Sequence, residues 1–249
     1  MAEYNPNRGP SWNYGGKNWK LSRSKIDLFL ECPRCFYVDN KLGTKQPPIP
    51  SFQINKAVDH QLKQEFDFYR AKDTQHPLQK EYGIDARPAQ HEKLGEWREN
   101  FEGVQYLHEP TGIVVSGAID DLWINANDEY IVVDYKATAK NEPIKELDDS
   151  RWHQGYRKQI EVYQWLLRRN GLKVSDIAYF VYCTGKYDEA VFDKKIEFDV
   201  NLISYKGNDS WVEPTIIKIK KCLDNTVIPD SGDSCEHCAY WYARRKYEK

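Results

Sequence analysis

The chain begins without a regular hydrophobic period and then alternates between helix-like and strand-like patterns. Residues 1–20 are rich in Gly, Asn and Pro and show neither period, so we expect a flexible N-terminal tail there. Residues 52–71 carry apolar side chains at helical spacing. A second amphipathic run covers residues 154–171 and ends in two arginines followed by Asn-Gly, which suits a helix C-terminus.

Strand-like patterns begin at Gly112, where Val, Ile, Tyr and Phe become frequent. Short helices are expected from Ser24 and around 91–101, and a last helix at about 211–224. Helices interleaved with strands indicate an α/β protein with a mixed central sheet flanked by helices. We expect one domain over residues 21–249 with its core at about 52–200. The predicted strands are 112–124, 129–137, 177–184 and 193–199.

Composition narrows the classes of protein only slightly. No run of about 18 apolar residues is present, so no membrane span is expected. The N-terminus also lacks the apolar segment of a secretory signal, which favours a cytoplasmic protein. The net charge of −2 neither requires nor excludes a nucleic-acid partner, because a local basic groove would suffice.

Carboxylates interrupt two of the predicted strands. The break "NANDE" predicts a hairpin turn, with Asn127 in a left-handed position. If the hairpin is centred on Asn127, Asp120 faces Asp134, because they lie equally far from it. Facing carboxylates repel unless something compensates, and a divalent cation would bind both. A slip of one residue would put Asp121 in place of Asp120.

Side chains alternate along a strand, so Lys136 lies on the same face as Asp134. An Asp-x-Lys on a strand is commonly just a solvated face, and a single helical histidine such as His60 is commonly structural. Gln159 and Tyr163, one helical turn apart, fit an ordinary helix face equally well. The order of all these features in one chain is more specific than any of them alone.

That order resembles the PD-(D/E)XK nuclease superfamily, and most closely its RecB-type branch, which includes the CRISPR-adaptation exonucleases. The resemblance covers about residues 22–243 and implies a restriction-endonuclease-like core. The segments that carry it are His60, Gly117-x-x-Asp120, Asp134-Tyr135-Lys136, and Gln159 with Tyr163. One departure is Ala137, since the branch usually has Thr directly after the lysine.

The resemblance also implies roles for these residues. Lys136 would orient or deprotonate the attacking water, and Gln159 and Tyr163 would brace the site or touch the substrate. The implied Mg²⁺ or Mn²⁺ ligands are His60, Asp120 and Asp134, with the backbone carbonyl of Tyr135. A metal in such a site lowers the pKa of its water and shields the negative charge of the phosphate.

Two Cys-x-x-Cys pairs lie near opposite ends of the chain, in "CPRC" and "CEHC". Their four thiolates suit one zinc ion or a four-iron cluster, which would staple a helical cap made of residues 21–50 and 205–249. Several RecB-type nucleases hold a [4Fe-4S] cluster with one cysteine before the core and three after it. In this chain the two Cys-x-x-Cys pairs supply Cys32, Cys35, Cys235 and Cys238.

The match to the iron-sulfur pattern is incomplete, because Arg244 stands where the last cysteine is expected. Cys35 would replace it, so we expect a [4Fe-4S] cluster with zinc as the alternative. Cys222 is a reserve candidate. Cys183 lies in a strand and is expected to be core.

These features together predict a metal-dependent nuclease that hydrolyses DNA phosphodiester bonds. By resemblance, it would act as an exonuclease on free or single-stranded ends, with a helicase or integrase as partner. Basic and aromatic residues mix near the C-terminus, in "YWYARRKY", which suits single-stranded nucleic acid, but such a segment more commonly packs against the cysteines. The alternative is a non-catalytic binding or structural subunit of a DNA repair, recombination or CRISPR complex.

Overall fold

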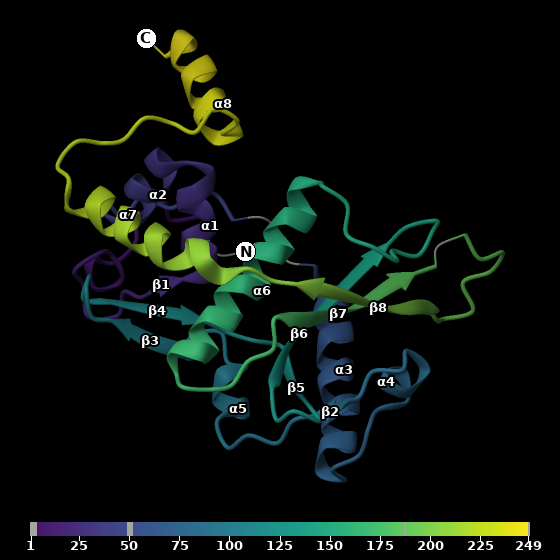
Figure 1. Cartoon of the computed structure of the whole chain (residues 1–249). Helices are drawn as coiled ribbons and strands as arrows, with labels where there is room; N and C mark the ends of the chain where they lie inside the picture. Colours follow the sequence, from purple (N-terminus) through teal and green to yellow (C-terminus); the bar gives the residue numbers. More distant parts are fainter. Residues whose placement is uncertain (1–3, 49–51, 187, 249) are drawn as a thin grey trace. The chain divides into compact units, whose positions relative to one another are not determined.

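The structure is a computed structural model that describes residues 4–48, 52–186 and 188–248 (Figure 1). The α-helices are α1 (Arg23–Glu31), α2 (Pro33–Asn40), α3 (Gln53–Ala71), α4 (Pro77–Glu81), α5 (Leu94–Trp97), α6 (Arg151–Arg169), α7 (Val212–Asp224) and α8 (Glu236–Arg244). Short 3-10 helices are η1 (Pro10–Trp12), η2 (Asp209–Trp211) and η3 (Arg245–Tyr247). The strands are β1 (Leu21–Ser22), β2 (Ala86–Pro88), β3 (Val104–His108), β4 (Ile113–Gly117), β5 (Asp121–Asn125), β6 (Tyr130–Ala139), β7 (Ile177–Gly185) and β8 (Phe198–Lys206).

The main sheet has five strands in the order β2-β5-β6-β7-β8. Strands β6 and β7 pair in parallel, and the other neighbours pair antiparallel. A smaller sheet has the order β1-β4-β3. The predicted mixed sheet with flanking helices is therefore confirmed, and β6 is the central strand of the main sheet.

Helices α3 and α6 lie on opposite faces of the main sheet (Figure 1). Alternation along β6 explains this arrangement, because successive side chains point to opposite faces. Val133 and Tyr135 join a cluster with Phe66 of α3. On the other face, the ammonium of Lys136 lies over the ring of Tyr156 of α6. The same strand therefore presents an apolar face to α3 and a polar one to α6.

Two predicted strands differ from the observed ones. The single strand expected at 112–124 is divided into β4 and β5, because the chain leaves the small sheet after Gly117 and joins the main sheet at Asp121. The strand expected at 193–199 lies further along, as β8. Asp193 and Lys194 have φ angles of 43° and 59°, which an extended strand does not allow.

The predicted helices differ mainly at their N-termini and in length. Helix α1 is capped at Ser22 rather than beginning from Ser24. Helix α6 begins at Arg151, where the Ser150 side chain accepts a hydrogen bond from the His153 amide. The helix expected at 91–101 is only the four residues of α5. These are boundary errors, and each predicted helix is in the expected part of the chain.

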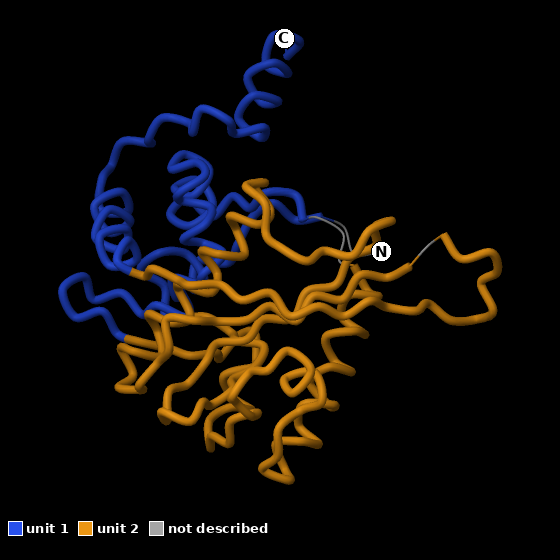
Figure 2. The backbone as a smooth tube through the Cα atoms, turned by 45° about the vertical axis from the view of Figure 1, so that its right-hand side comes forward, with its two compact units in different colours: residues 1–50, 107–116, 210–249 blue, residues 51–106, 117–209 orange. Residues whose placement is uncertain are grey.

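The chain divides into two compact units (Figure 2). Unit 1 comprises residues 1–50, 107–116 and 210–249, and unit 2 comprises residues 51–106 and 117–209. Within the expected tail, the backbone of Arg8 bonds to Gly43, and its guanidinium pairs with Asp39 at 2.7 Å. None of the helices in the described part of the chain combines the length and the apolar character that a membrane span needs.

Candidate functional site

The turn between β5 and β6 is held by the side chain of Asn125. Its Oδ1 accepts hydrogen bonds from the amides of Asn127 at 3.0 Å and Glu129 at 2.9 Å. The left-handed residue is Asp128, with φ of 57°, rather than the expected Asn127. Short polar side chains such as that of Asp128 tolerate this conformation. The left-handed residue is therefore one position later than predicted, and the hairpin itself is unchanged.

The register of the hairpin is the predicted one. Asp121 faces Val133, which excludes the one-residue slip that would set Asp121 opposite Asp134. Asp120 precedes the first paired residue of β5 and remains beside β6. Its Oδ2 accepts a hydrogen bond from the Tyr135 amide at 2.9 Å. A carboxylate is thereby fixed next to the middle of the central strand.

Asp134 and Lys136 form an ion pair on the α6 face of β6. Asp134 is fully buried, and its Oδ2 contacts the ammonium of Lys136. Lys136 also donates to Gln159 Oε1 at 3.4 Å, and its Nζ lies 4.6 Å from the ring centre of Tyr156. A buried carboxylate is destabilising unless a positive charge pairs with it. Asp134 therefore keeps the ammonium of Lys136 at this position.

Gln159 and Tyr163 support Lys136 from α6. Gln159 Nε2 donates to the Tyr163 hydroxyl at 3.0 Å, and both side chains are buried. Tyr163 in turn packs on Gly117, where an added Cβ would lie 2.7 Å from the ring. The glycine of Gly117-x-x-Asp120 is therefore required for the close approach of the backbone at Gly117 to α6. The structure brings Gln159, Tyr163 and Lys136 together, as the order of motifs predicted.

Helix α3 brings a second lysine to Asp120. Lys63 Nζ lies 3.5 Å from Asp120 Oδ1 and 2.9 Å from Asp59 Oδ2. Burial alone would lower the pKa of Lys63, but the two carboxylates raise it above its ordinary value. Asp59 and Lys63 were not predicted to lie here. The available signal was their i, i+4 spacing, which puts them on one side of the helix.

Asp121 belongs to a separate network on the α3 face. It is fully buried and accepts hydrogen bonds from Arg70, from Arg98 at 2.8 Å and from the Tyr135 hydroxyl at 2.6 Å. Asp67 pairs with both arginines as well. Two guanidinium groups thus neutralise Asp121, which suits a structural ion-pair network in the core.

His60 is not brought to the two aspartates by a described interaction. Its side chain is exposed, whereas Asp59, one residue earlier, lines a small cavity of about 110 Å³ with Lys136 and Tyr156. Tyr135 is fixed through its amide and its hydroxyl, as given above. In residues 4–48, 52–186 and 188–248, the one group of three or more His, Cys, Asp or Glu side chains with ligand atoms within 4.8 Å is the four cysteines.

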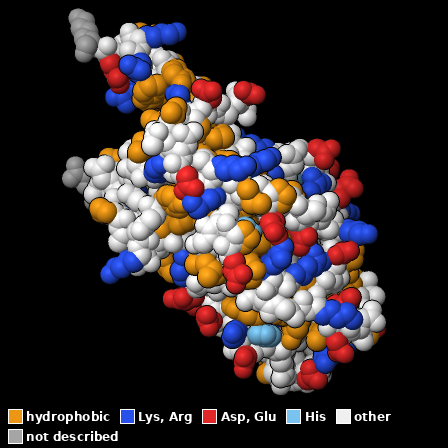
Figure 3. Space-filling model, turned by 60° about the vertical axis from the view of Figure 1, so that its left-hand side comes forward, with side chains coloured by type: hydrophobic (Ala, Val, Ile, Leu, Met, Phe, Trp, Pro, Cys, Tyr) orange, Lys and Arg blue, Asp and Glu red, His pale blue; other side chains and the backbone are white. Residues whose placement is uncertain are grey.

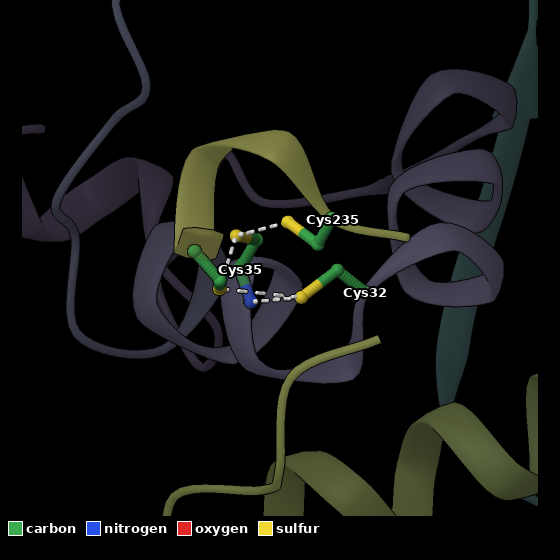
Figure 4. Close-up of side chains that lie close together, drawn as sticks. Cys32, Cys35 and Cys235 are labelled. Carbon is green, nitrogen blue, oxygen red and sulfur yellow. Dashed lines mark hydrogen bonds between the residues drawn. The ribbon is translucent and has the colours of Figure 1, made fainter. Parts of the chain in front are cut away.

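The four cysteines converge within unit 1 (Figure 4). Cys32 lies between α1 and α2, and Cys235 caps α8. The Sγ–Sγ distances are 3.5 Å from Cys35 to Cys235, 3.6 Å from Cys35 to Cys238 and 3.7 Å from Cys32 to Cys238. Four sulfurs at these distances can bind a metal.

Backbone amides point at the sulfur of Cys32. The Gly232 amide lies 3.3 Å and the Cys35 amide 3.4 Å from its Sγ. Burial would raise the pKa of Cys32, but these two N–H groups lower it below its ordinary value. An added Cβ on Gly232 would lie 2.0 Å from the Glu31 carbonyl, so only glycine allows this approach. The surroundings of Cys32 favour a thiolate.

The comparisons agree with this geometry. No curated protein matches the chain. A family model described as the PD-(D/E)XK nuclease superfamily matches residues 20–243, which include Asp120, Asp134, Lys136 and all four clustered cysteines. Since the match covers most of the chain, this protein belongs to the PD-(D/E)XK nuclease superfamily.

Proposed function

We propose that this chain is a metal-dependent nuclease that hydrolyses phosphodiester bonds in DNA. The observation that carries the proposal is the arrangement around β6. Asp134 is buried against the ammonium of Lys136, and the carboxylate of Asp120 is fixed at the amide of Tyr135. Two acids and a lysine at the centre of a sheet in a member of this superfamily support a hydrolytic site.

The donor set fits a divalent cation. Asp120 and Asp134 offer carboxylate oxygens, which Mg²⁺ and Mn²⁺ prefer. Each acid contacts a lysine ammonium, Asp120 that of Lys63 and Asp134 that of Lys136, so both carboxylates lie in positions that favour a positive charge. We propose that Asp120 and Asp134 hold the ion, with His60 and the Tyr135 carbonyl as further proposed ligands. When bound, the ion would lower the pKa of a water and shield the charge of the phosphate.

The side chains of the chain itself would orient the reactants. Lys136 Nζ, held by Asp134 and Gln159, would donate to the attacking water or to a phosphate oxygen. The hydrogen bond from Gln159 to Tyr163 fixes the direction of this donor. The ring of Tyr156 lies against the ammonium of Lys136, whose side chain is only 15% exposed. A lysine restrained from three sides loses little entropy when it binds the transition state.

The resemblance to the RecB-type branch supports DNA ends as the substrate and exonucleolytic cutting. The experiment uses end-labelled linear single strands, linear duplexes and a circular single strand, each with Mn²⁺, Mg²⁺ or chelator. We expect linear DNA to shorten from an end in the presence of metal, and the circle to remain intact. RNA of the same sequence is the control for substrate class. If no substrate is cut with either metal, the protein is not a nuclease and the proposal fails.

We further propose that the four cysteines bind one zinc ion. A tetrahedral zinc, about 2.3 Å from each sulfur, separates its ligands by about 3.8 Å. The described Sγ–Sγ distances of 3.5 to 3.7 Å are close to this value. In a four-iron cluster each thiolate binds a different iron, which holds the sulfurs further apart. The spacing therefore favours zinc over the [4Fe-4S] cluster that the sequence pattern placed first.

A further inference from the structure

The C-terminal helix of unit 1 exposes aromatic and basic side chains side by side. Tyr240, Trp241 and Tyr242 follow one another on α8, and all three are exposed. After Ala243 the chain continues with Arg244 and Arg245. Figure 3 shows hydrophobic and basic side chains together over the C-terminal end of the chain, at the top of the view. Soluble proteins rarely expose large contiguous apolar patches, so a cluster of exposed aromatic side chains marks a site of interaction.

A groove of about 540 Å³ lies beside these aromatic residues, within unit 1. Tyr240 and Trp241 line one part of it, and Val38 and Pro47 line another. Arg34 and Lys45 are among the residues that line it, and no Asp or Glu is among the described residues that do so. The chain as a whole carries 38 acidic and 36 basic side chains, so an acid-free lining is selective for a negatively charged ligand.

Guanidinium groups already lie on two of the rings. Arg245 is 4.7 Å from the ring centre of Trp241, and Arg34 is 5.7 Å from that of Tyr242. Arg34 also donates a hydrogen bond to the Tyr242 hydroxyl. Aromatic rings with cations this close provide stacking and phosphate neutralisation at the same place.

We propose that this surface, formed by Tyr240, Trp241, Arg245, Arg34 and Lys45, binds single-stranded nucleic acid. Bases stack on the rings of Tyr240 and Trp241. The three cations of this surface neutralise neighbouring phosphates. A duplex keeps its bases stacked inside, so it cannot offer their faces to the groove. The proposal rests on the proposed nuclease function for the kind of ligand, and it adds a substrate-binding surface apart from the residues around Lys136.

The cysteine centre holds this surface in position. Cys235 caps helix α8 and Cys238 lies in its first turn, whereas Cys32 caps α2 and Cys35 lies in the first turn of α2. A metal bound to all four joins α8 to the segment that supplies Arg34 to the groove. Loss of the metal is therefore expected to weaken binding of the strand.

The test measures the fluorescence anisotropy of a labelled oligothymidylate on the full chain carrying Lys136→Ala, so that the probe is not cut. Adding Trp241→Ala removes one stacking face and weakens binding about tenfold or more. Trp12→Ala is the matched control, because Trp12 and Trp241 are both 47% exposed and Trp12 does not line the groove. Binding by the control is expected to remain unchanged.

A second variant guards against a folding defect. Arg245→Glu keeps every ring and reverses one charge, so it should weaken binding and reduce its dependence on salt. Equal binding by Trp241→Ala and Trp12→Ala would overturn the proposal, as would a duplex that binds as tightly as the single strand. If the intact chain cuts no DNA but Trp241→Ala still loses the oligothymidylate, the nuclease function fails and this surface stands.

Discussion

Asp120 and Asp121 are adjacent in the sequence and lie in opposite environments. Asp120 is partly exposed, with Lys63 and the Tyr135 amide as its partners. Asp121 is fully buried between Arg70 and Arg98. Neighbouring residues point to opposite sides, so Asp120 faces the proposed active site and Asp121 faces the core. Substitutions of the two residues are therefore expected to have different effects.

Two substitutions distinguish these environments. Asp120→Asn keeps an acceptor for the Tyr135 amide but removes a charge, so we expect a loss of cleavage of about 100-fold or more and a change in unfolding free energy below about 1 kcal/mol. Asp121→Asn leaves Arg70 and Arg98 without a buried counter-charge, which costs about 3 to 5 kcal/mol. Urea denaturation and a cleavage assay measure both effects. The reverse pattern would mean that the two aspartates have been assigned wrongly.

Lys25 gives unit 1 a measurable dependence on pH. Loss of water around Lys25 and the nearby charge of Arg8 lower its pKa from 10.5 to about 8, although Asp39 opposes the change. Between these values the unfolded chain binds more protons than the folded chain, so the free energy of unfolding rises from pH 8 to about 10.5. Lys25→Gln should reduce that rise, measured by urea denaturation across this range. Exposed Lys17→Gln is the control and should leave the slope unchanged.

At the scale of elements, the packing of Gly117 against α6 determines where the proposed lysine lies. Gly117 allows Tyr163 to approach, Tyr163 accepts from Gln159, and Gln159 contacts Lys136. This chain of contacts connects a glycine in one strand to a side chain in another. It gives a physical reason for the glycine in the Gly117-x-x-Asp120 pattern.

Substitution of Gly117 tests this packing. In Gly117→Ala the new Cβ would lie 2.7 Å from Tyr163, so we expect a loss of about 1 to 3 kcal/mol in stability and weaker cleavage. Gly155→Ala is the matched control, because a Cβ there meets no atom within 4 Å and alanine favours a helix by up to about 1 kcal/mol. Thermal unfolding and cleavage are measured for both. If Gly117→Ala behaves like Gly155→Ala, the contact with Tyr163 does not position the site.

Elements whose period is strong were predictable from the sequence. Alternation of apolar residues predicted the central hairpin and its register, and helical spacing predicted α3, α6 and α7. Both patterns arise because one face of each element is buried. The prediction of a strand at 193–199 was wrong, because Asp193 and Lys194 have positive φ angles. The residue types in this segment do not reveal such a local backbone conformation. Lys63 was missed because its role depends on the docking of α3 beside Asp120, which is a tertiary contact.

At the scale of the whole molecule, the cysteine centre connects residues about 200 positions apart. Cys32 and Cys35 come from the N-terminal part of unit 1, and Cys235 and Cys238 from its C-terminal part. A metal that joins them restricts the unfolded chain and binds only the folded one. The centre should therefore contribute to stability independently of cleavage chemistry.

Metal analysis tests this centre. We expect about one zinc per chain and no brown colour in protein purified without oxygen. Cys235→Ala should lose the zinc and unfold at lower temperature, whereas Cys222→Ala should keep it, because Cys222 lies outside the cluster. Iron and sulfide in the wild-type protein would show instead that the site holds an iron-sulfur cluster.

The most direct measurement is the rate at which the chain and two lysine variants cleave labelled linear single-stranded DNA with Mn²⁺. Lys136→Ala removes the ammonium between Asp134 and Gln159, and Lys173→Ala removes an exposed lysine that bonds to the hairpin turn at Asn127. We predict that Lys136→Ala lowers the rate about 100-fold or more, while Lys173→Ala cleaves like the wild type. Metal-dependent cleavage that survives Lys136→Ala unchanged would contradict the proposed active site.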